Sequence, residues 1–327
     1  MGDIQILGRG GRVAGSVVSA VLAAVTLGWI VRDLARGSGP DDLWWQWAGW
    51  PGRYGLQEVA YTAGQDVLLL LVYAVVAVKV MRSASAAVML AATGALTVAL
   101  RLPAVVALVG EPEGVELFGG PTPGALLTTA GSVLGGAALI VVAAAGRRAA
   151  GPGEAAVPPG RGAAGWSGVL LLVSGATMLA WPAYTVVDHG WERYAAMYLD
   201  TGSAPRSALL GGVGWQTAAV AGLALAGAAV CFRRGRGART LGLSAAVQIG
   251  GAQVFVLSAY LQGQVYVQFR HLDTHTQLML VTPPVLCALA AVVLALLLPR
   301  PAAAEPGPGG APWQAPAPEP YGAPGPR

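Results

Sequence analysis

Charged residues are scarce in this chain. They make up 11% of its 327 residues, whereas apolar residues make up 55%. Soluble globular domains usually carry about a quarter charged residues, so this composition excludes an ordinary soluble domain. Apolar runs recur along the whole chain, and a helix of about 18 or more such residues crosses a hydrocarbon core of roughly 30 Å. The sequence therefore predicts an all-α integral membrane protein.

Cysteine, lysine and several catalytic motifs are also rare or missing. The two cysteines, Cys231 and Cys287, lie within apolar runs, where a thiol acts as a small hydrophobic group, so neither a disulfide nor a thiolate metal site is expected. Lys79 is the only lysine, and this preference for Arg, with abundant Ala, Gly and Pro, is typical of a GC-rich bacterial genome. The sequence contains no phosphate-binding loop, nucleophile elbow, zinc-protease helix or basic-aromatic nucleic-acid patch. We therefore predict no catalytic residue and no nucleic-acid partner.

Apolar runs predict eight transmembrane helices in two groups of four. The first group forms a membrane repeat over residues 1–146, and the second forms one over residues 166–300. A polar cytoplasmic linker is expected at 147–165, and a disordered Pro/Ala/Gly-rich tail at 301–327, which has almost nothing to bury. The expected helices span residues 13–35, 64–81, 84–109, 124–146, 166–187, 208–232, 240–262 and 277–298.

The two groups resemble each other in sequence. Leu27–Trp29 matches Leu179–Trp181, and Gly64–Asp66 matches Gly214–Gln216. Because each group contains an even number of helices, both would enter the membrane from the same side as parallel repeats, related by an axis along the membrane normal. The alternative is that two four-helix halves only look alike, since matches between Ala- and Leu-rich helices also arise by chance.

Basic residues predict the orientation, because Lys and Arg in short loops stay on the cytoplasmic side. Most of them fall on the side of the N-terminus, while most acidic residues fall on the other. We therefore expect a multi-pass plasma-membrane protein with both termini in the cytoplasm. The first apolar run, which follows Arg9 and Arg12, has no convincing signal-cleavage site and is expected to remain as a helix.

Four tryptophans are concentrated in the first outer loop. Trp44, Trp45, Trp47 and Trp50 lie within ten residues of one another. Indole rings favour the membrane interface, so one interpretation is an aromatic belt on a short interfacial helix. The other is a cap over an outward-facing cavity that binds a lipid or another amphipathic ligand.

All three histidines are expected on the outer side. His271 and His275 are one helical turn apart, and His189 lies in the preceding outer loop. With Asp273 they could complete a zinc or copper site, since neutral imidazole and carboxylate are common ligands of these metals. Solvated or hydrogen-bonded loop histidines are the other interpretation.

Arg101 is the notable charge within an apolar helix. A charged residue at this depth costs at least about 2.5 to 3.5 kcal/mol on insertion scales, so it should be paired or should reach the interface. Asp66, near the outer end of the second predicted helix, is the expected partner. The pair could have a structural role, or it could bind an anion or orient a ligand.

These patterns favour a non-catalytic membrane protein: a transport-related, ligand-binding or accessory component with outward-facing specificity loops. The alternative is a membrane enzyme with the His and carboxylate metal site on its outer side. Membrane lipid is the expected partner, and the tail offers Trp313 and Tyr321 as a docking motif for a protein. The sequence identifies no cofactor.

Overall fold

The computed structural model describes residues 5–36, 39–49, 60–110, 122–151, 154, 156–195, 207 and 209–298. Met1–Leu297 form one compact unit, and Leu298–Arg327 form a second, of which only Leu298 is described. The predicted tail and its Trp313 and Tyr321 therefore lie outside the described residues.

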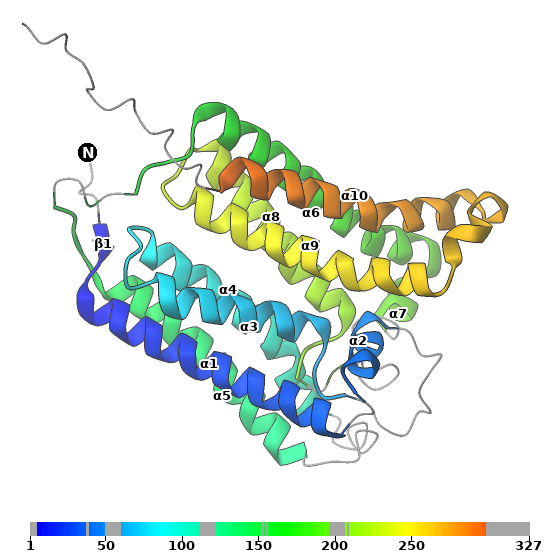
Figure 1. The fold of residues 1–327 in the computed structure, drawn as a ribbon, viewed down its shortest axis with the longest axis horizontal. Coiled ribbons are helices and arrows are strands. Elements are labelled where there is room, and N and C mark those ends of the chain that lie inside the picture. Colours follow the sequence, from blue (N-terminus) through cyan, green and yellow to red (C-terminus); the bar gives the residue numbers. More distant parts are fainter. Residues whose placement is uncertain are drawn as a thin grey trace, which may run out of the picture. The chain divides into compact units, whose positions relative to one another are not determined.

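Long helices run side by side along the first unit (Figure 1). Among the described residues, seven of them are long and apolar enough to cross a membrane, so the prediction of a multi-pass, all-α membrane protein is supported. The helix left out of that set is α3, whose 16 residues extend about 24 Å at 1.5 Å per residue. The long helices are α1 (Arg9–Arg36), α3 (Gly64–Lys79), α4 (Ala86–Gly110), α5 (Thr122–Ala145), α6 (Arg161–His189), α8 (Val213–Phe232), α9 (Ala238–Gln262) and α10 (Thr274–Leu297).

Shorter elements join the long helices at their two ends. The helices α2 (Pro40–Ala48) and α7 (Trp191–Tyr194) and the 3₁₀-helix η4 (Val265–His271) lie at one end, and the strands β1 (Gln5–Leu7) and β2 (Arg147–Ala149) lie at the other. The strands pair antiparallel, which fixes the beginning of α1 beside the end of α5.

The segment predicted as a linker is partly regular. Its first residues form β2, and α6 begins at Arg161 rather than at residue 166. Arg148 of β2 forms an exposed ion pair with Glu154, with Nη2 and Oε1 2.9 Å apart. The hydrogen bonds from the Arg148 side chain hold the pKa of Glu154 below its usual range.

Each group of four long helices has its own apolar core. We call α1, α3, α4 and α5 the first half, and α6, α8, α9 and α10 the second half. One core is built around Leu69, Leu90 and Leu139 of the first half, with Leu210 added from the segment before α8. The other is built around residues of the second half, including Leu171 and Ile249.

The helices pair in the same way within the two halves. In each half the first helix packs against the second and the fourth, and the third also packs against the second and the fourth. A hydrogen bond recurs at the same place: Trp29 Nε1 donates to Thr128 Oγ1 at 3.0 Å, and Trp181 Nε1 donates to Thr282 Oγ1 at 3.2 Å. Both bonds join the first helix of a half to the fourth.

The contact between the halves is close and interlocking. It is made chiefly by α3 against α9 and by α4 against α8. A Cβ atom added at Gly64 would lie 2.6 Å from the Phe255 ring, so only glycine lets the two helices approach this closely there. Gly251 of α9 receives the Leu68 side chain of α3 in the same way. Each half therefore inserts a bulky side chain into a glycine gap of the other.

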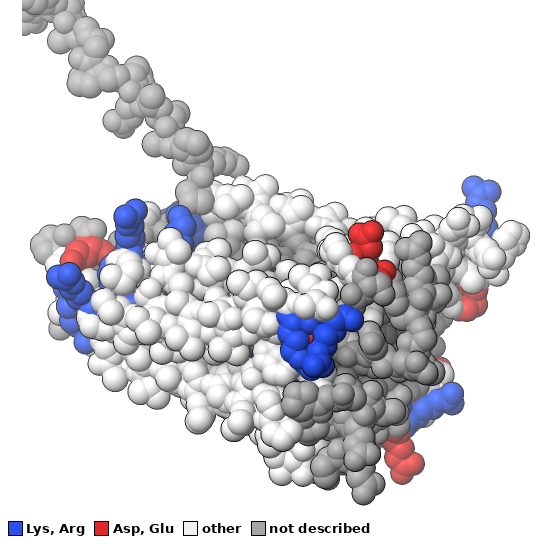
Figure 2. All heavy atoms as spheres, turned by 60° about the horizontal axis from the view of Figure 1, so that its bottom comes forward, with Lys and Arg blue, Asp and Glu red and all other residues white. Residues whose placement is uncertain are grey.

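Charged residues are separated from a long uncharged flank. Figure 2 brings forward the side of the bundle that carries α1 and shows a broad band without charged residues along the helices. Exposed apolar side chains, among them Val17, Val21 and Leu134, are consistent with a surface that faces lipid.

Candidate functional site: a buried ion pair beside the contact between the halves

Asp66 is positioned by the first turn of α3. Its Oδ2 atom accepts a hydrogen bond of 2.8 Å from the backbone N–H of Ala63, the residue that caps the helix. A carboxylate at this position pairs with a backbone donor that the helix cannot satisfy and with the positive end of the helix dipole. The carboxylate is therefore held with one oxygen on the cap and the other free to meet a cation.

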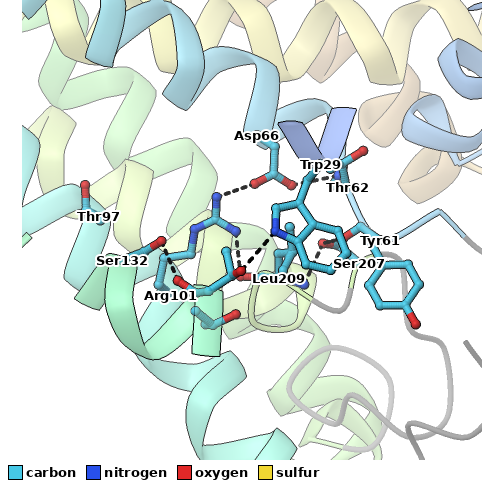
Figure 3. Close-up of polar contacts among 12 residues, drawn as sticks. Trp29, Tyr61, Thr62, Asp66, Thr97, Arg101, Ser132, Ser207 and Leu209 are labelled. Carbon is cyan, nitrogen blue, oxygen red and sulfur yellow. Dashed lines mark hydrogen bonds and ion pairs between the residues drawn. The ribbon is translucent and has the colours of Figure 1, made fainter. Parts of the chain in front are cut away.

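Arg101 of α4 supplies that cation. Its Nη2 atom lies 2.6 Å from Asp66 Oδ1, and the two side chains are 1% and 0% exposed (Figure 3). The expected ion pair is present, and the guanidinium does not reach the surface. Asp66 and Arg101 carry opposite charges at this short distance, so each offsets part of the cost of burying the other.

Arg101 also binds the second half. Its Nη1 atom donates a hydrogen bond of 2.8 Å to the carbonyl oxygen of Leu209, just before α8. Beside it, the backbone N–H of Gly211 donates to the carbonyl oxygen of Leu100 at 3.2 Å. The ion pair thus lies within the first half, and Arg101 connects it to the segment that leads into α8.

Further buried polar groups extend from the pair toward α1. Asp33 Oδ2 accepts hydrogen bonds from the backbone N–H of Thr62 at 2.8 Å and from its hydroxyl at 2.7 Å. Ser207 donates to the carbonyl oxygen of Tyr61 at 2.7 Å and accepts from the N–H of Leu209 at 3.1 Å. Figure 3 shows Tyr61, Thr62, Ser207 and Leu209 around Asp66 and Arg101. We call Asp33, Thr62, Asp66, Arg101 and Ser207 the buried polar cluster.

Other polar contacts surround the cluster within the helices. The Tyr73 hydroxyl and Thr97 Oγ1 lie 2.9 Å apart, and Arg101 also interacts electrostatically with Tyr73. Gln65 of α3 donates to Gln248 of α9, so an amide pair also links the halves. Such side chains usually stabilise contacts between membrane helices, at on the order of 1 kcal/mol each.

The tryptophan-rich segment docks on the bundle through α2. Trp44 packs on Phe255 with ring centroids 4.7 Å apart and donates to Ser258 Oγ at 3.2 Å. Trp47 meets the same phenylalanine edge-on at 6.2 Å and donates to Thr62 Oγ1 at 3.2 Å. The latter bond joins α2 directly to the buried polar cluster. Trp45 is half-buried, and Trp50 lies outside the described residues.

The three histidines among the four predicted metal ligands differ in their surroundings. His275 stacks on Tyr184 with centroids 4.5 Å apart, and His189 Nδ1 lies 3.3 Å from Asp188 Oδ2. His271, at the end of η4, is exposed. Across the described residues, His, Cys, Asp and Glu form no group of three or more that could hold a metal ion. The metal site stays a prediction without such a group to support it.

Asp273, the fourth predicted ligand, caps α10. It accepts hydrogen bonds from the backbone N–H of Thr276 at 2.9 Å and from its hydroxyl at 2.7 Å. These bonds lower the pKa of the Asp273 carboxyl below its usual value of 3.8, the backbone bond contributing most. Both carboxylate oxygens are therefore already engaged by the chain itself.

Sequence reasoning identified the ion pair but missed its surroundings. Arg32 and Asp33 fall at the outer end of the first expected helix, and the sequence did not indicate that they belong to the site. In the structure Asp33 is buried, and the Arg32 guanidinium packs over Tyr61 at 4.1 Å and Trp29 at 4.7 Å from the ring centroids. The Leu209 carbonyl is a backbone group, so its side chain gave no signal of this contact.

No family model, no curated protein and no solved structure matches this chain.

Proposed function

We propose that this chain is a non-catalytic, multi-pass protein of the bacterial plasma membrane that acts as a ligand-binding or accessory component. In this proposal α3 is an eighth span, the halves are parallel repeats, and both termini are cytoplasmic. Outward-facing segments, including α2 and η4, carry specificity. The observation that carries the proposal is the interlocked contact between the halves, beside which Arg101 of the buried ion pair donates a hydrogen bond to the segment before α8.

The interlock favours a ligand-binding or accessory role over a carrier whose halves rock. Rocking would withdraw Phe255 from the gap at Gly64 and Leu68 from the gap at Gly251. It would also strain the hydrogen bond between Arg101 and Leu209, which is buried. An unsatisfied buried polar group costs about 1–3 kcal/mol, and more when it is charged, so each cycle would lose several such contacts together.

The repeat is supported by the shared helix pairings and by the two equivalent Trp–Thr bonds. The candidate sites, by contrast, are not repeated. The position of Asp66 corresponds to Gln216, which donates to the Gly211 carbonyl at 2.8 Å and contributes no charge. The two halves would then share a scaffold, while the first supplies the ion pair.

Asp66 and Arg101, with Trp44, Trp45, Trp47 and Trp50, remain our proposed ligand-binding residues. The bond between Trp47 and Thr62 supports this grouping, because it connects the tryptophan-rich segment to the buried polar cluster. A ligand that displaces α2 would reach the cluster from the outer side. Lipid is the proposed partner of the exposed flank, and the tail 301–327 is a proposed docking segment for a protein.

Single-cysteine labelling tests the topology, after Cys231 and Cys287 are replaced by Ala. Cysteine at exposed Arg36 should react with an impermeant maleimide added outside intact cells, and cysteine at exposed Arg82 should react only after the membrane is opened. Labelling of both positions from the same side would remove α3 from the spans and reverse the orientation of every later helix.

Metal analysis tests the non-catalytic assignment. Protein purified without chelator should contain no stoichiometric zinc or copper. A retained metal that is lost when His271 and His275 are both changed to Ala would instead support the membrane enzyme, with His189 and Asp273 as further ligands.

A further inference from the structure

A hollow of about 440 Å³ lies where η4 packs beside α10. Its size falls within the usual range of small-molecule sites, roughly 300–1,000 Å³. We call this hollow the η4 groove. Most of its lining residues are apolar or aromatic, namely Tyr266, Val267 and Phe269 of η4 and Val281 and Pro284 of α10.

Proline creates the attachment point for η4. Pro284 has no N–H, so the carbonyl oxygen of Leu280, one turn earlier in α10, lacks its helical donor. The Tyr266 hydroxyl replaces that donor with a hydrogen bond of 2.8 Å. Gln277 of α10 adds bonds to the carbonyl oxygens of Phe269 at 3.0 Å and Leu272 at 2.9 Å. The groove is therefore a built feature with both walls tied together.

The groove extends well into a candidate membrane span. Val281 and Pro284 belong to α10, which is apolar enough to cross a membrane, whereas η4 lies between the spans α9 and α10. No residue of η4 is buried, and Val267 is 78% exposed. Apolar side chains so exposed beside a span meet acyl chains or the lipid interface rather than a protein core.

Two basic residues complete the lining, namely Arg270 and His271. Both are exposed, and Arg270 has no ion-pair partner among the residues that the structure describes. The acid nearest in sequence, Asp273, is engaged by Thr276 through both oxygens. Guanidinium binds phosphate through two parallel hydrogen bonds, so Arg270 supplies a phosphate-binding group at one part of the groove.

We propose that the η4 groove binds one anionic phospholipid of the adjoining leaflet. An acyl chain lies against Val281, Pro284 and the aromatic rings, and the phosphate binds Arg270 with His271 beside it. This inference depends only on α10 crossing the membrane. It does not depend on the ion pair or on the proposed role of the protein.

Lipid retention measured by native mass spectrometry tests this site. Purified full-length protein is exchanged with phosphatidylglycerol or phosphatidylcholine of identical acyl chains. Wild type should retain one phosphatidylglycerol in preference to phosphatidylcholine. Arg270→Gln should weaken phosphatidylglycerol binding about fivefold, the usual contribution of one basic residue at an anionic membrane surface. Arg36→Gln, at an exposed basic residue on the same end of the bundle but outside the groove, is the matched control and should leave binding unchanged.

A second variant tests the apolar wall. Val281 is 41% exposed, so Val281→Trp should fill the groove without disturbing the core and should lower retention of both lipids. Equal retention of the two lipids by wild type, unchanged binding by Arg270→Gln, or an equal loss in Arg36→Gln would overturn the proposal. Displacement of the lipid by millimolar inorganic phosphate would also overturn it, because the site would then recognise free phosphate.

Discussion

Removing one partner of the Asp66–Arg101 pair should destabilise the protein far more than removing both. Arg101→Met leaves the Asp66 carboxylate buried and unpaired and also removes the donor to the Leu209 carbonyl. Breaking a buried pair in this way costs about 3–5 kcal/mol. Asp66→Asn should cost a similar amount, because Arg101 loses its counter-charge. The amide oxygen can still accept the hydrogen bond from the backbone N–H of Ala63.

The double variant, Asp66→Asn with Arg101→Met, carries neither buried charge. It should therefore be less destabilised than either single variant. Its remaining loss, about 1–3 kcal/mol, comes from the Leu209 carbonyl, which has lost its hydrogen-bond donor. Equilibrium unfolding by dodecyl sulfate in mixed micelles measures each free energy and closes the cycle. Arg148→Gln removes the exposed pair with Glu154 and should cause no measurable loss of stability, since the side chains of Arg148 and Glu154 are 50% and 42% exposed. Additive losses in the double variant would refute the reasoning.

Three further predictions follow from packing, hydrogen bonding and titration. Gly94→Ala should destabilise the protein by about 1–3 kcal/mol, because the new Cβ would collide with a carbonyl oxygen of α5. In the same unfolding assay, Gly222→Ala is the control. Its new Cβ would meet nothing within 4 Å, so it should be neutral or stabilising by up to about 1 kcal/mol. Trp29→Phe and Trp181→Phe should each cost about 1 kcal/mol, and their double variant should be additive, because the two equivalent bonds lie in different halves; coupling between them would contradict that separation. Asp273 has a lowered pKa, so its contribution to the start of α10 is complete above its usual value of 3.8 and is lost as the pH falls through the lower folded value. Hydrogen exchange in the first turn of α10 should show this loss in wild type and no such dependence in Asp273→Asn.

The sequence predicted the long helices well because apolar run length decides them directly. Each expected run overlaps a helix of the structure, and the bounds differ by a few residues, as for α6, which begins at Arg161. Pairing of Asp66 with Arg101 could also be predicted, because an arginine in an apolar helix needs a counter-charge and an acid near the end of the preceding helix was available.

The contact between the halves could not be predicted in this way. It depends on which glycines face which bulky side chains, as at Gly64 and Phe255, and helical periodicity does not identify partners in another half. The role of Leu209 rests on a backbone carbonyl, and that of Asp33 on the path of the chain through Thr62. The sequence also could not predict whether the four proposed metal ligands come close together, since spacing along the chain does not determine distances between loops.

Distances between spin labels on the two halves test the central claim most directly. One pair, at exposed Arg82 and Arg236, reports the end of the bundle that carries the strands, and another, at exposed Arg36 and Arg270, reports the end that carries α2 and η4. In lipid bilayers, double electron–electron resonance should give one narrow distance distribution for each pair, because the halves form a single interlocked unit. Two populations at each end, with the distance at one end increasing as the distance at the other decreases, would show rocking halves and contradict this account.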